Sequence, residues 1–238
     1  MLITRLIKEI FSSGDKTGAA GGPQPDVPAG PGDGDYSFTV DWFSTCIPVW
    51  RRVFSLIPEA ARILEIGSYE GRSTVWLIEN AYQAGGKGEL HCVDTWQGGV
   101  EHHAAGMPAV EERFLRNIAL AKSRSRAQVE VHVHKGLSSS VLTALAAKGH
   151  AGSFDAIHVD GSHQCHDVLC DLVLSFQLCR VGGIIICDDY DWSQEAQGAE
   201  DLLNQPKLAI DSFLNCYRRK LELVDINVRQ AYLRKTAA

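Results

Sequence analysis

The chain has 238 residues, of which 45% are hydrophobic and 22% charged, and its 23 Lys and Arg against 29 Asp and Glu give a formal charge of −6 at pH 7. This composition is typical of a globular protein with one large domain or two small ones. The acidic balance and the absence of a Lys/Arg run in the sequence argue against nucleic acid as a partner. No stretch reaches the roughly 18 uninterrupted apolar residues of a spanning helix, so we expect no stable membrane insertion.

Seven cysteines make an odd number and include no CxxC pair or zinc-like spacing. Most lie in apolar runs such as residues 184–187, where a free cysteine behaves as a small hydrophobic side chain. We therefore expect free thiols in a reducing, cytoplasmic setting and no disulfide framework. A reactive thiol among them is the alternative.

Two segments precede the main domain. Residues 1–13 carry apolar side chains on one helical stripe, but charges interrupt it and no cleavage site follows, so it is neither a signal peptide nor a membrane span. We expect this piece to dock on protein or to be disordered, in preference to binding a membrane surface. In residues 14–34, 7 Gly and 4 Pro among 21 positions predict a flexible linker. Residues 35–238 then form a single domain.

From residue 35 onward, apolar strand-like runs alternate with amphipathic stretches, a pattern typical of βαβ units. It predicts an α/β fold, namely a Rossmann-like, seven-stranded, mainly parallel sheet with helices on both faces and a C-terminal antiparallel hairpin. Pro48 is expected to interrupt a leading helix over 38–57. The predicted strands are 62–67, 89–94, 129–134, 154–159, 183–188, 221–226 and 230–235. The predicted helices lie near 72–83, 110–122, 138–148, 163–179 and 206–219.

Ligands of an open parallel sheet bind outside the carboxyl ends of its strands, so the residues that follow each strand are informative. The first strand runs into the turn 67–73, where Gly67 allows close backbone approach to a ligand. Ser73 and the free amides of the following helix can hold an anionic group. The alternative is a simple strand-to-helix turn. Tyr69 replaces the second glycine of a dinucleotide fingerprint, which disfavours NAD and an oxidoreductase.

An acidic residue ends the second strand. Asp94 lies 27 residues after Gly67, where a carboxylate can accept hydrogen bonds from a ribose diol. A nucleoside without a diphosphate is thus implied, and S-adenosylmethionine (SAM) fits that description. Gly136 and Ser138, after the third strand, lie where the adenine edge would fall.

Three carboxylates converge at the ends of the fourth and fifth strands, Asp160 and, 28 residues later, Asp188 with Asp189. Such a group raises its own pKa values by repulsion unless a cation compensates, and Mg²⁺ prefers oxygen ligands of this kind. The sequence therefore predicts a magnesium site on these three side chains. Alternatively, Asp160 and Asp188 cap the turns that follow them and Asp189 is solvated.

His163 lies three residues beyond Asp160, at the predicted start of a helix. Because histidine takes up a proton near neutral pH, we expect His163 to be a general base for a substrate hydroxyl, with His166 as an auxiliary. The other histidines that were weighed are expected to be structural and to lack convergent partners: His91, His132, His134, His150 and His158.

The long polar loop after the second strand is expected to line or cover the substrate site, with Glu101 and His102 as candidates. A solvated loop is the alternative. Several tryptophans are candidate walls of the substrate site or, equally, parts of the core or of a dimer interface: Trp42, Trp50, Trp96 and Trp192.

A set of residues at the strand ends resembles class I SAM-dependent methyltransferases over residues 38–236. The likeness is greatest to the metal-dependent O-methyltransferases that act on sugar hydroxyls of macrolide and aminocoumarin antibiotics (macrocin O-methyltransferase-like), and more distant to catechol O-methyltransferases. Glu70 and Arg72 differ from the residue types found at these positions in the SAM-binding loop of the catechol enzymes. Both alternate along the loop with the positions expected to contact SAM, so the differences hardly weaken the resemblance. The residues that carry the resemblance are Glu65-x-Gly67-x-x-x-Gly71, Asp94, Asp160-Gly161-Ser162-His163 and Asp188-Asp189-Tyr190.

The resemblance implies methyl transfer from SAM to a small-molecule hydroxyl, on a sugar rather than a catechol because His stands where the catechol enzymes have Lys. The same His favours an aliphatic hydroxyl as well as a sugar over a catechol. The resemblance also implies a homo-oligomer, Mg²⁺ on Asp160, Asp188 and Asp189, and His163 as base. Two alternatives stay open, a SAM-binding partner protein without catalysis and a methyltransferase for a nitrogen, lipid or protein acceptor. The implied cofactor contacts are Glu65, Gly67, Ser68, Tyr69, Gly71, Ser73, Asp94, Thr95, Gly136, Ser138 and Asp160.

Overall fold

The computed structural model describes residues 35–57, 61–99, 109–196 and 198–238. The expected amphipathic segment 1–13 and linker 14–34 lie outside these residues, as do the loop candidates Glu101 and His102. The described residues contain one sheet, and the predicted α/β architecture with its C-terminal hairpin is confirmed.

Seven strands form a single sheet in the order β3-β2-β1-β4-β5-β7-β6. The first five are parallel to their neighbours, whereas β7 runs antiparallel between β5 and β6. Each strand coincides with an apolar run of the sequence to within a few residues. The strands are β1 (Arg62–Ile66), β2 (Lys87–Asp94), β3 (Gln128–Lys135), β4 (Phe154–Val159), β5 (Cys179–Cys187), β6 (Leu221–Ile226) and β7 (Ala231–Lys235).

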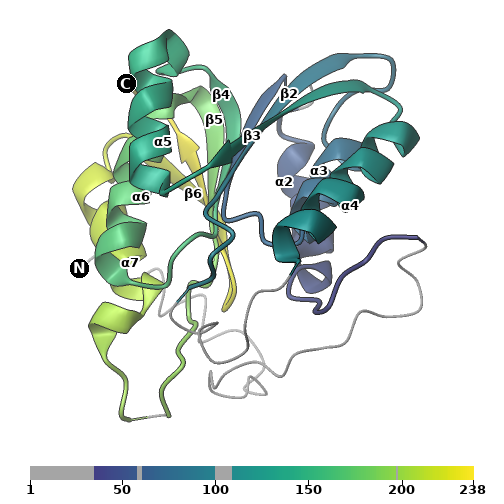
Figure 1. Ribbon diagram of the computed structural model, residues 1–238. Helices are drawn as coiled ribbons and strands as arrows, with labels where there is room; N and C mark the ends of the chain where they lie inside the picture. The colour runs from purple at the N-terminus through teal and green to yellow at the C-terminus, as the bar shows by residue number, and fades with distance from the viewer. Residues whose placement is uncertain (1–34, 58–60, 100–108, 197) are drawn as a thin grey trace.

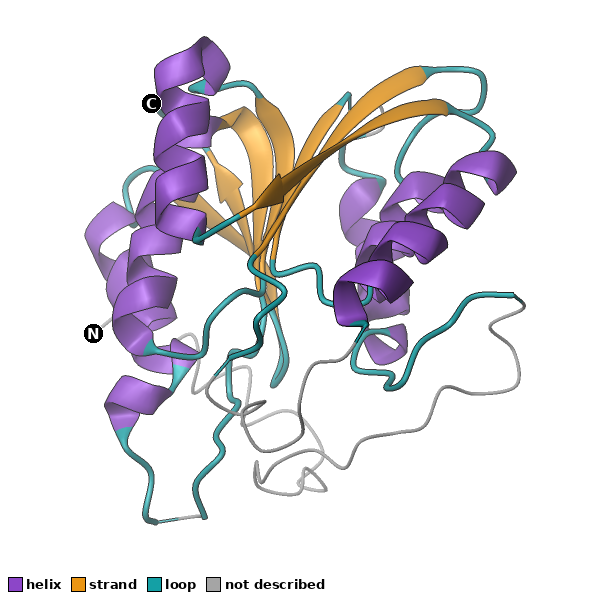
Figure 2. Ribbon diagram, in the orientation of Figure 1, coloured by secondary structure: helices purple, strands orange, loops and turns teal. Residues whose placement is uncertain are grey.

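The helices form two layers, with α2, α3 and α4 on one face of the sheet and α5, α6 and α7 on the other (Figure 1). Figure 2 shows the twisted sheet between these layers. Each interface has its own apolar core, because the strands are buried on both faces. The helices are α2 (Ile47–Phe54), α3 (Arg72–Asn80), α4 (Val110–Arg124), α5 (Ser138–Leu145), α6 (Cys165–Leu178) and α7 (Pro206–Tyr217), with short helical turns at Ser44–Cys46, Ala146–His150 and Leu202–Asn204.

Pro48 begins a helix and does not interrupt one, contrary to the prediction. It lies in the first turn of α2, where its missing N–H has no intrahelical partner to lose. The helix predicted over 163–179 is also shorter than expected. It begins at Cys165, and Cys179 already belongs to β5, so His163 lies in the loop before the helix.

The carboxyl ends of β1 and β4 meet where the strand order reverses, which is the expected ligand position in such a sheet. Gly67 follows β1 with a φ of +83°, and a Cβ there would lie 1.8 Å from the carbonyl oxygen of Asp160. Only glycine therefore fits, and its close approach to Asp160 brings the two predicted site loops together.

The described cysteines are free thiols, five of them buried, as the apolar runs predict. None of the helices in the described ranges has the length and apolar character needed to cross a membrane.

Candidate active site

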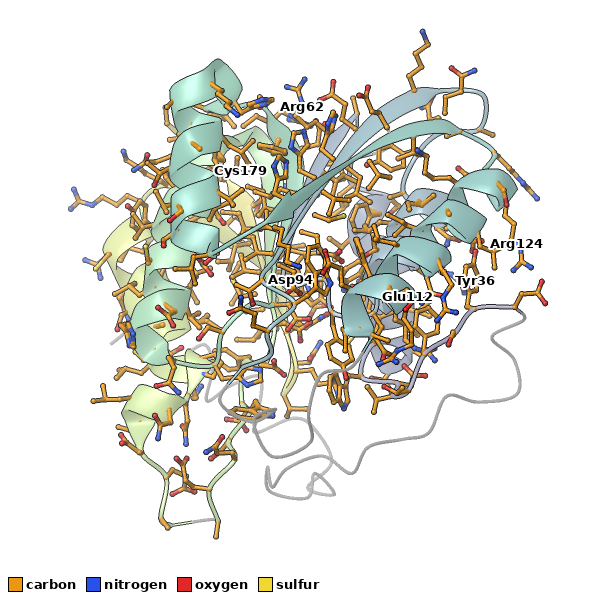
Figure 3. The ribbon with its side chains drawn as sticks, viewed as in Figure 1. Tyr36, Arg62, Asp94, Glu112, Arg124 and Cys179 are labelled. Atoms are coloured by element: carbon orange, nitrogen blue, oxygen red, sulfur yellow. The ribbon has the colours of Figure 1, made fainter. Side chains whose placement is uncertain are left out.

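The turn after β1 is built around the carboxylate of Asp94. Its Oδ2 accepts the backbone N–H groups of Ser68 and Tyr69 at 2.9 and 2.8 Å, and its Oδ1 accepts that of Trp96 at 2.7 Å. Tyr69 has a φ of +47°, and Gly71, which precedes α3, has a φ of +83°. Asp94 thus holds the predicted cofactor turn at the end of β2, near the middle of the molecule in Figure 3.

Glu65 lies fully buried beneath this turn. It accepts hydrogen bonds from the hydroxyls of Ser68 (2.8 Å), Ser73 (2.6 Å) and Thr74. The Ser73 hydroxyl therefore supports the turn from below in this structure, and the N–H groups at the start of α3 are the remaining donors for an anionic group. Glu65 orders the turn from inside the protein.

The sequence reasoning gave no role to Glu70, which is 1% exposed. Its carboxylate accepts the backbone N–H of Thr39 at 2.6 Å and the Nε–H of Arg113 at 2.6 Å. Glu70 therefore fastens the segment before α2 and the start of α4 to the turn. This segment also brings Trp42 to Tyr69, with 5.3 Å between ring centroids.

The other predicted cofactor residues lie at the neighbouring strand ends. Thr95 follows β2, and Gly136 follows β3 with its N–H donating to the Asp94 carbonyl at 2.9 Å. Ser138 is the first residue of α5. The structure thus brings the predicted cofactor residues to the carboxyl edge of β1, β2, β3 and β4.

His158 is the centre of the charged part of the site. Its side chain is 2% exposed; Nε2 donates to Asp188 Oδ2 at 2.9 Å, and Nδ1 lies 3.8 Å from Glu65 Oε1. Nε2 is also 4.0 Å from Asp160 Oδ2. Gln230 donates to the same Asp188 oxygen at 2.6 Å. The prediction that His158 lacks convergent partners is wrong.

The charges of this cluster support one another. Burial alone would lower the pKa of His158, but its hydrogen bond with Asp188 and the nearby Glu65 and Asp160 raise the pKa to about 10. Burial disfavours ionised Asp188, yet the bond from His158 keeps its pKa below the usual value. Burial and the charges of Asp188 and Asp189 raise the pKa of Asp160. His158 is therefore an internal imidazolium at neutral pH.

The predicted metal ligands are brought together in part. Ligand atoms of His158, Asp160 and Asp188 lie within 4.8 Å of one another, whereas the carboxylate of Asp189 lies against His163. No side-chain hydrogen bond reaches the Asp160 carboxylate from the described residues, and its pKa is raised by burial and then by the excess of negative charge from Asp188 and Asp189. Oxygen donors with this excess fit a hard divalent cation.

His163 is held from two sides. Its Nε2 lies 2.8 Å from Asp189 Oδ2, and its ring packs on Trp192 with 3.9 Å between centroids. Asp189 has a φ of +54°, which turns its side chain back toward the loop after β4. The predicted base is thus oriented by a carboxylate and an aromatic ring, and its side chain is 16% exposed.

The sequence did not predict two further residues of the site, and only the first of them left a signal. His158 is two residues before Asp160 in a strand, and side chains two apart share a face. Gln230 joins the site from the C-terminal hairpin, where it accepts a hydrogen bond from Trp50 Nε1 at 2.9 Å. A contact between two residues that are 180 positions apart leaves no local pattern in the sequence.

The sequence profile of a methyltransferase domain family matches residues 64–190, a little over half of the chain. The matched range begins in β1 and ends just after Asp189, so it contains the turn and the charged cluster described above. A search of curated proteins returned no match.

Solved structures share the fold. The O-methyltransferase TomG from Streptomyces achromogenes, involved in tomaymycin synthesis and solved with SAM, is 18% identical, with 86% of this chain and 83% of that one covered and a TM-score of 0.56. The Bacillus cereus O-methyltransferase solved with S-adenosylhomocysteine (SAH) is 19% identical, with 79% of each chain covered and a TM-score of 0.54.

MycE, a methyltransferase of the mycinamycin biosynthetic pathway solved with Mg, SAH and mycinamycin VI, is 17% identical, with a TM-score of 0.54. The alignment covers 82% of this chain and 50% of MycE, so this chain spans about half the length of that relative. At these identities the likeness concerns the fold.

The charge of His158 makes stability depend on pH. Its pKa of about 10 in the folded chain exceeds the unfolded value of about 6.5, so its contribution is complete below about pH 6.5 and is lost as the pH rises through about 10. In EDTA, His158→Gln should lower the free energy of unfolding by roughly 3–5 kcal/mol at pH 6, and the loss should shrink toward pH 10. Urea unfolding across this pH range measures the difference.

His166→Gln is the matched control, because the His166 side chain is 78% exposed. It should change the stability little at any pH. A His158→Gln difference that stays constant from pH 6 to pH 10 would show that His158 is neutral in the folded protein.

Proposed function

The chain belongs to a family of methyltransferase domains, and we propose that it transfers a methyl group from SAM to a hydroxyl of a small molecule. The observation that carries the proposal is the meeting of two parts at one sheet edge. The Asp94-bound turn is suited to a nucleoside with a carboxylate, and the Asp160–Asp188 cluster with His163 is suited to activating a hydroxyl. Gly67 and Asp160 join the two parts directly.

The turn favours SAM over a dinucleotide. Tyr69 occupies the position where a dinucleotide-binding turn has a glycine that lets the pyrophosphate approach the backbone. Its ring packs on Trp42. N–H groups at the start of α3 provide donors for the SAM carboxylate, and Asp94 lies at the strand end where ribose hydroxyls are bound in such folds. Asp94 already accepts three N–H groups, so it also fixes the shape of the turn.

Mg²⁺ is proposed as a second ligand, held by Asp160 and Asp188 with Asp189 beside them. Burial and the charges of Asp188 and Asp189 raise the pKa of Asp160, and the nearby His158 and His163 offset this only in part. A divalent cation would compensate for the remaining repulsion among the carboxylates. When bound, it would lower the pKa of a coordinated hydroxyl.

His163 is proposed to take the hydroxyl proton. As the acceptor oxygen forms its bond to the methyl carbon, the carbon–sulfur bond of SAM breaks, SAH leaves, and the proton passes to the imidazole. Asp189 Oδ2 contacts Nε2 of this imidazole at 2.8 Å. Asp189 and Trp192 act as positioning residues that fix the ring.

A hydroxyl on a sugar or glycosylated natural product is the proposed acceptor. Two fold relatives act in biosynthesis: TomG is involved in tomaymycin synthesis, and MycE belongs to the mycinamycin biosynthetic pathway. Trp42 packs beside Tyr69 and Trp192 beside His163, and aromatic rings at these positions are suited to packing against a sugar ring.

SAH should bind the purified chain with a dissociation constant in the micromolar range, whereas NAD⁺ should not bind. Asp94→Asn should weaken SAH binding at least ~10-fold, because the loss of a charged acceptor for backbone N–H groups costs about 1.5–3 kcal/mol. Calorimetric titration measures both. Binding of NAD⁺ in place of SAH would contradict the cofactor assignment.

Mg²⁺ should bind chelator-treated protein, and Asp160→Asn should abolish the binding because it removes a charged ligand. The variant should still fold, because the substitution breaks no side-chain hydrogen bond among the described residues. Asp191→Asn, in the same loop region but exposed, is the matched control and should bind Mg²⁺ as the native chain does. Calorimetry with and without SAH measures the effect. Equal Mg²⁺ binding by the native chain and Asp160→Asn would remove Asp160 from the site.

His163→Ala should reduce methyl transfer by about 10²–10⁴-fold and leave the affinity for SAH within about twofold, since His163 lies outside the cofactor turn. A panel of glycosides with radiolabelled SAM provides the assay, and Gln164→Ala is the neighbouring control. An equally large loss of SAH binding would contradict the assignment of His163 as the base.

The same assay separates the alternative functions. SAH binding without methyl transfer to any acceptor would favour a partner protein without catalysis, and labelling of amines, lipids or protein would change the acceptor class.

A further inference from the structure

A second cluster of ligand-type side chains lies on β2 and β3, apart from the proposed active site. His91 on β2 is paired in register with His132 on β3, and His134 lies two residues further along β3 on the same face. His150, at the end of the turn after α5, completes the group. The prediction that these histidines lack convergent partners is wrong.

His91 is at the centre of this histidine cluster. Its ring centroid lies 4.5 Å from that of His132, 5.2 Å from that of His134 and 5.3 Å from that of His150. The His91 side chain is 4% exposed. Three imidazoles around one buried imidazole are an arrangement that apolar packing does not require.

The two nitrogens of His91 have different surroundings. Nδ1 lies 3.0 Å from Nε2 of His134. Nε2 is buried and has no hydrogen-bond partner in the part of the chain that the structure describes, and the nearest acid, Glu89, has its Oε2 3.7 Å away. An unpartnered buried nitrogen that faces a carboxylate points to a missing ligand.

We propose that Glu89, His91 and His132 bind a divalent transition-metal ion such as Zn²⁺. One ligand atom from each of the three lies within 4.8 Å of the others. Glu89 Oε2 is already 3.7 Å from His91 Nε2, and rotation of the one-third-exposed His132 side chain would bring its nitrogen toward the ~3.4 Å separations of a tetrahedral site. Imidazole nitrogens select zinc, copper or nickel over magnesium.

The surroundings of the three ligands suit this role. With Nδ1–H donated to His134, the lone pair is on Nε2, as in metal-bound histidines whose other nitrogen is hydrogen-bonded. Arg62 holds Glu89 through two contacts of 2.7 and 3.1 Å.

The histidine cluster is separate from the proposed magnesium site. Arg62, which contacts Glu89, begins β1, whereas Asp94 ends β2; Figure 3 shows Arg62 near the top of the molecule and Asp94 near its middle. A metal bound here would join the edge strand β3 to β2. We therefore expect a stabilising ion that takes no part in methyl transfer.

The test titrates Zn²⁺ into chelator-treated full-length protein that carries Asp160→Asn, which removes the other candidate metal site. Calorimetry should show one Zn²⁺ per chain, and bound Zn²⁺ should raise the melting temperature. Adding His132→Ala should weaken Zn²⁺ binding at least tenfold and cancel the rise. Because His132 is one-third exposed, the variant should fold.

His166→Ala in the same background is the control and should bind Zn²⁺ unchanged, since this exposed histidine lies on α6. Cu²⁺ in place of Zn²⁺ should give an electron paramagnetic resonance spectrum with nitrogen couplings that weaken on His132→Ala. Failure of the Asp160→Asn chain to bind Zn²⁺, or equal affinity with and without His132, would overturn the proposal.

Discussion

The site depends on one buried cation, the imidazolium of His158 between Asp188 and Glu65. Several carboxylates at one sheet edge repel each other strongly in a low-dielectric interior. His158 offsets part of that repulsion from inside the protein. Its contact with Asp188 at 2.9 Å and its approach to Glu65 at 3.8 Å hold the two acids on either side of β4.

This cation links the cofactor turn to the proposed chemistry. On one side, Glu65 gathers the hydroxyls that shape the turn; on the other, Asp188 is fixed by Gln230, which is bound in turn to Trp50 of α2. A buried polar network with its partners in place has a single low-energy arrangement. Asp160, which accepts no hydrogen bond in that network, keeps its carboxylate for a ligand.

The sequence predicted the sheet well because buried parallel strands read as apolar runs, and the polar residues after them mark the ligand edge. Asp94, Asp160 and Asp188 were found in that way. The prediction failed at Pro48 because a proline in the first turn of a helix loses no intrahelical hydrogen bond. Glu70 and Gln230 act through contacts with distant segments, which one sequence does not encode locally. His158 was missed because it was judged alone and not by the face it shares with Asp160.

The most direct test of this account is the protonation state of His158, followed by NMR of ¹⁵N-histidine-labelled protein in EDTA from pH 5 to pH 10.5. The His158 signal, assigned by its loss in His158→Gln, should remain that of an imidazolium through neutral pH and titrate near pH 10. A His158 that titrates near 6.5 would contradict the account, because the carboxylates would then require another cation to hold them together.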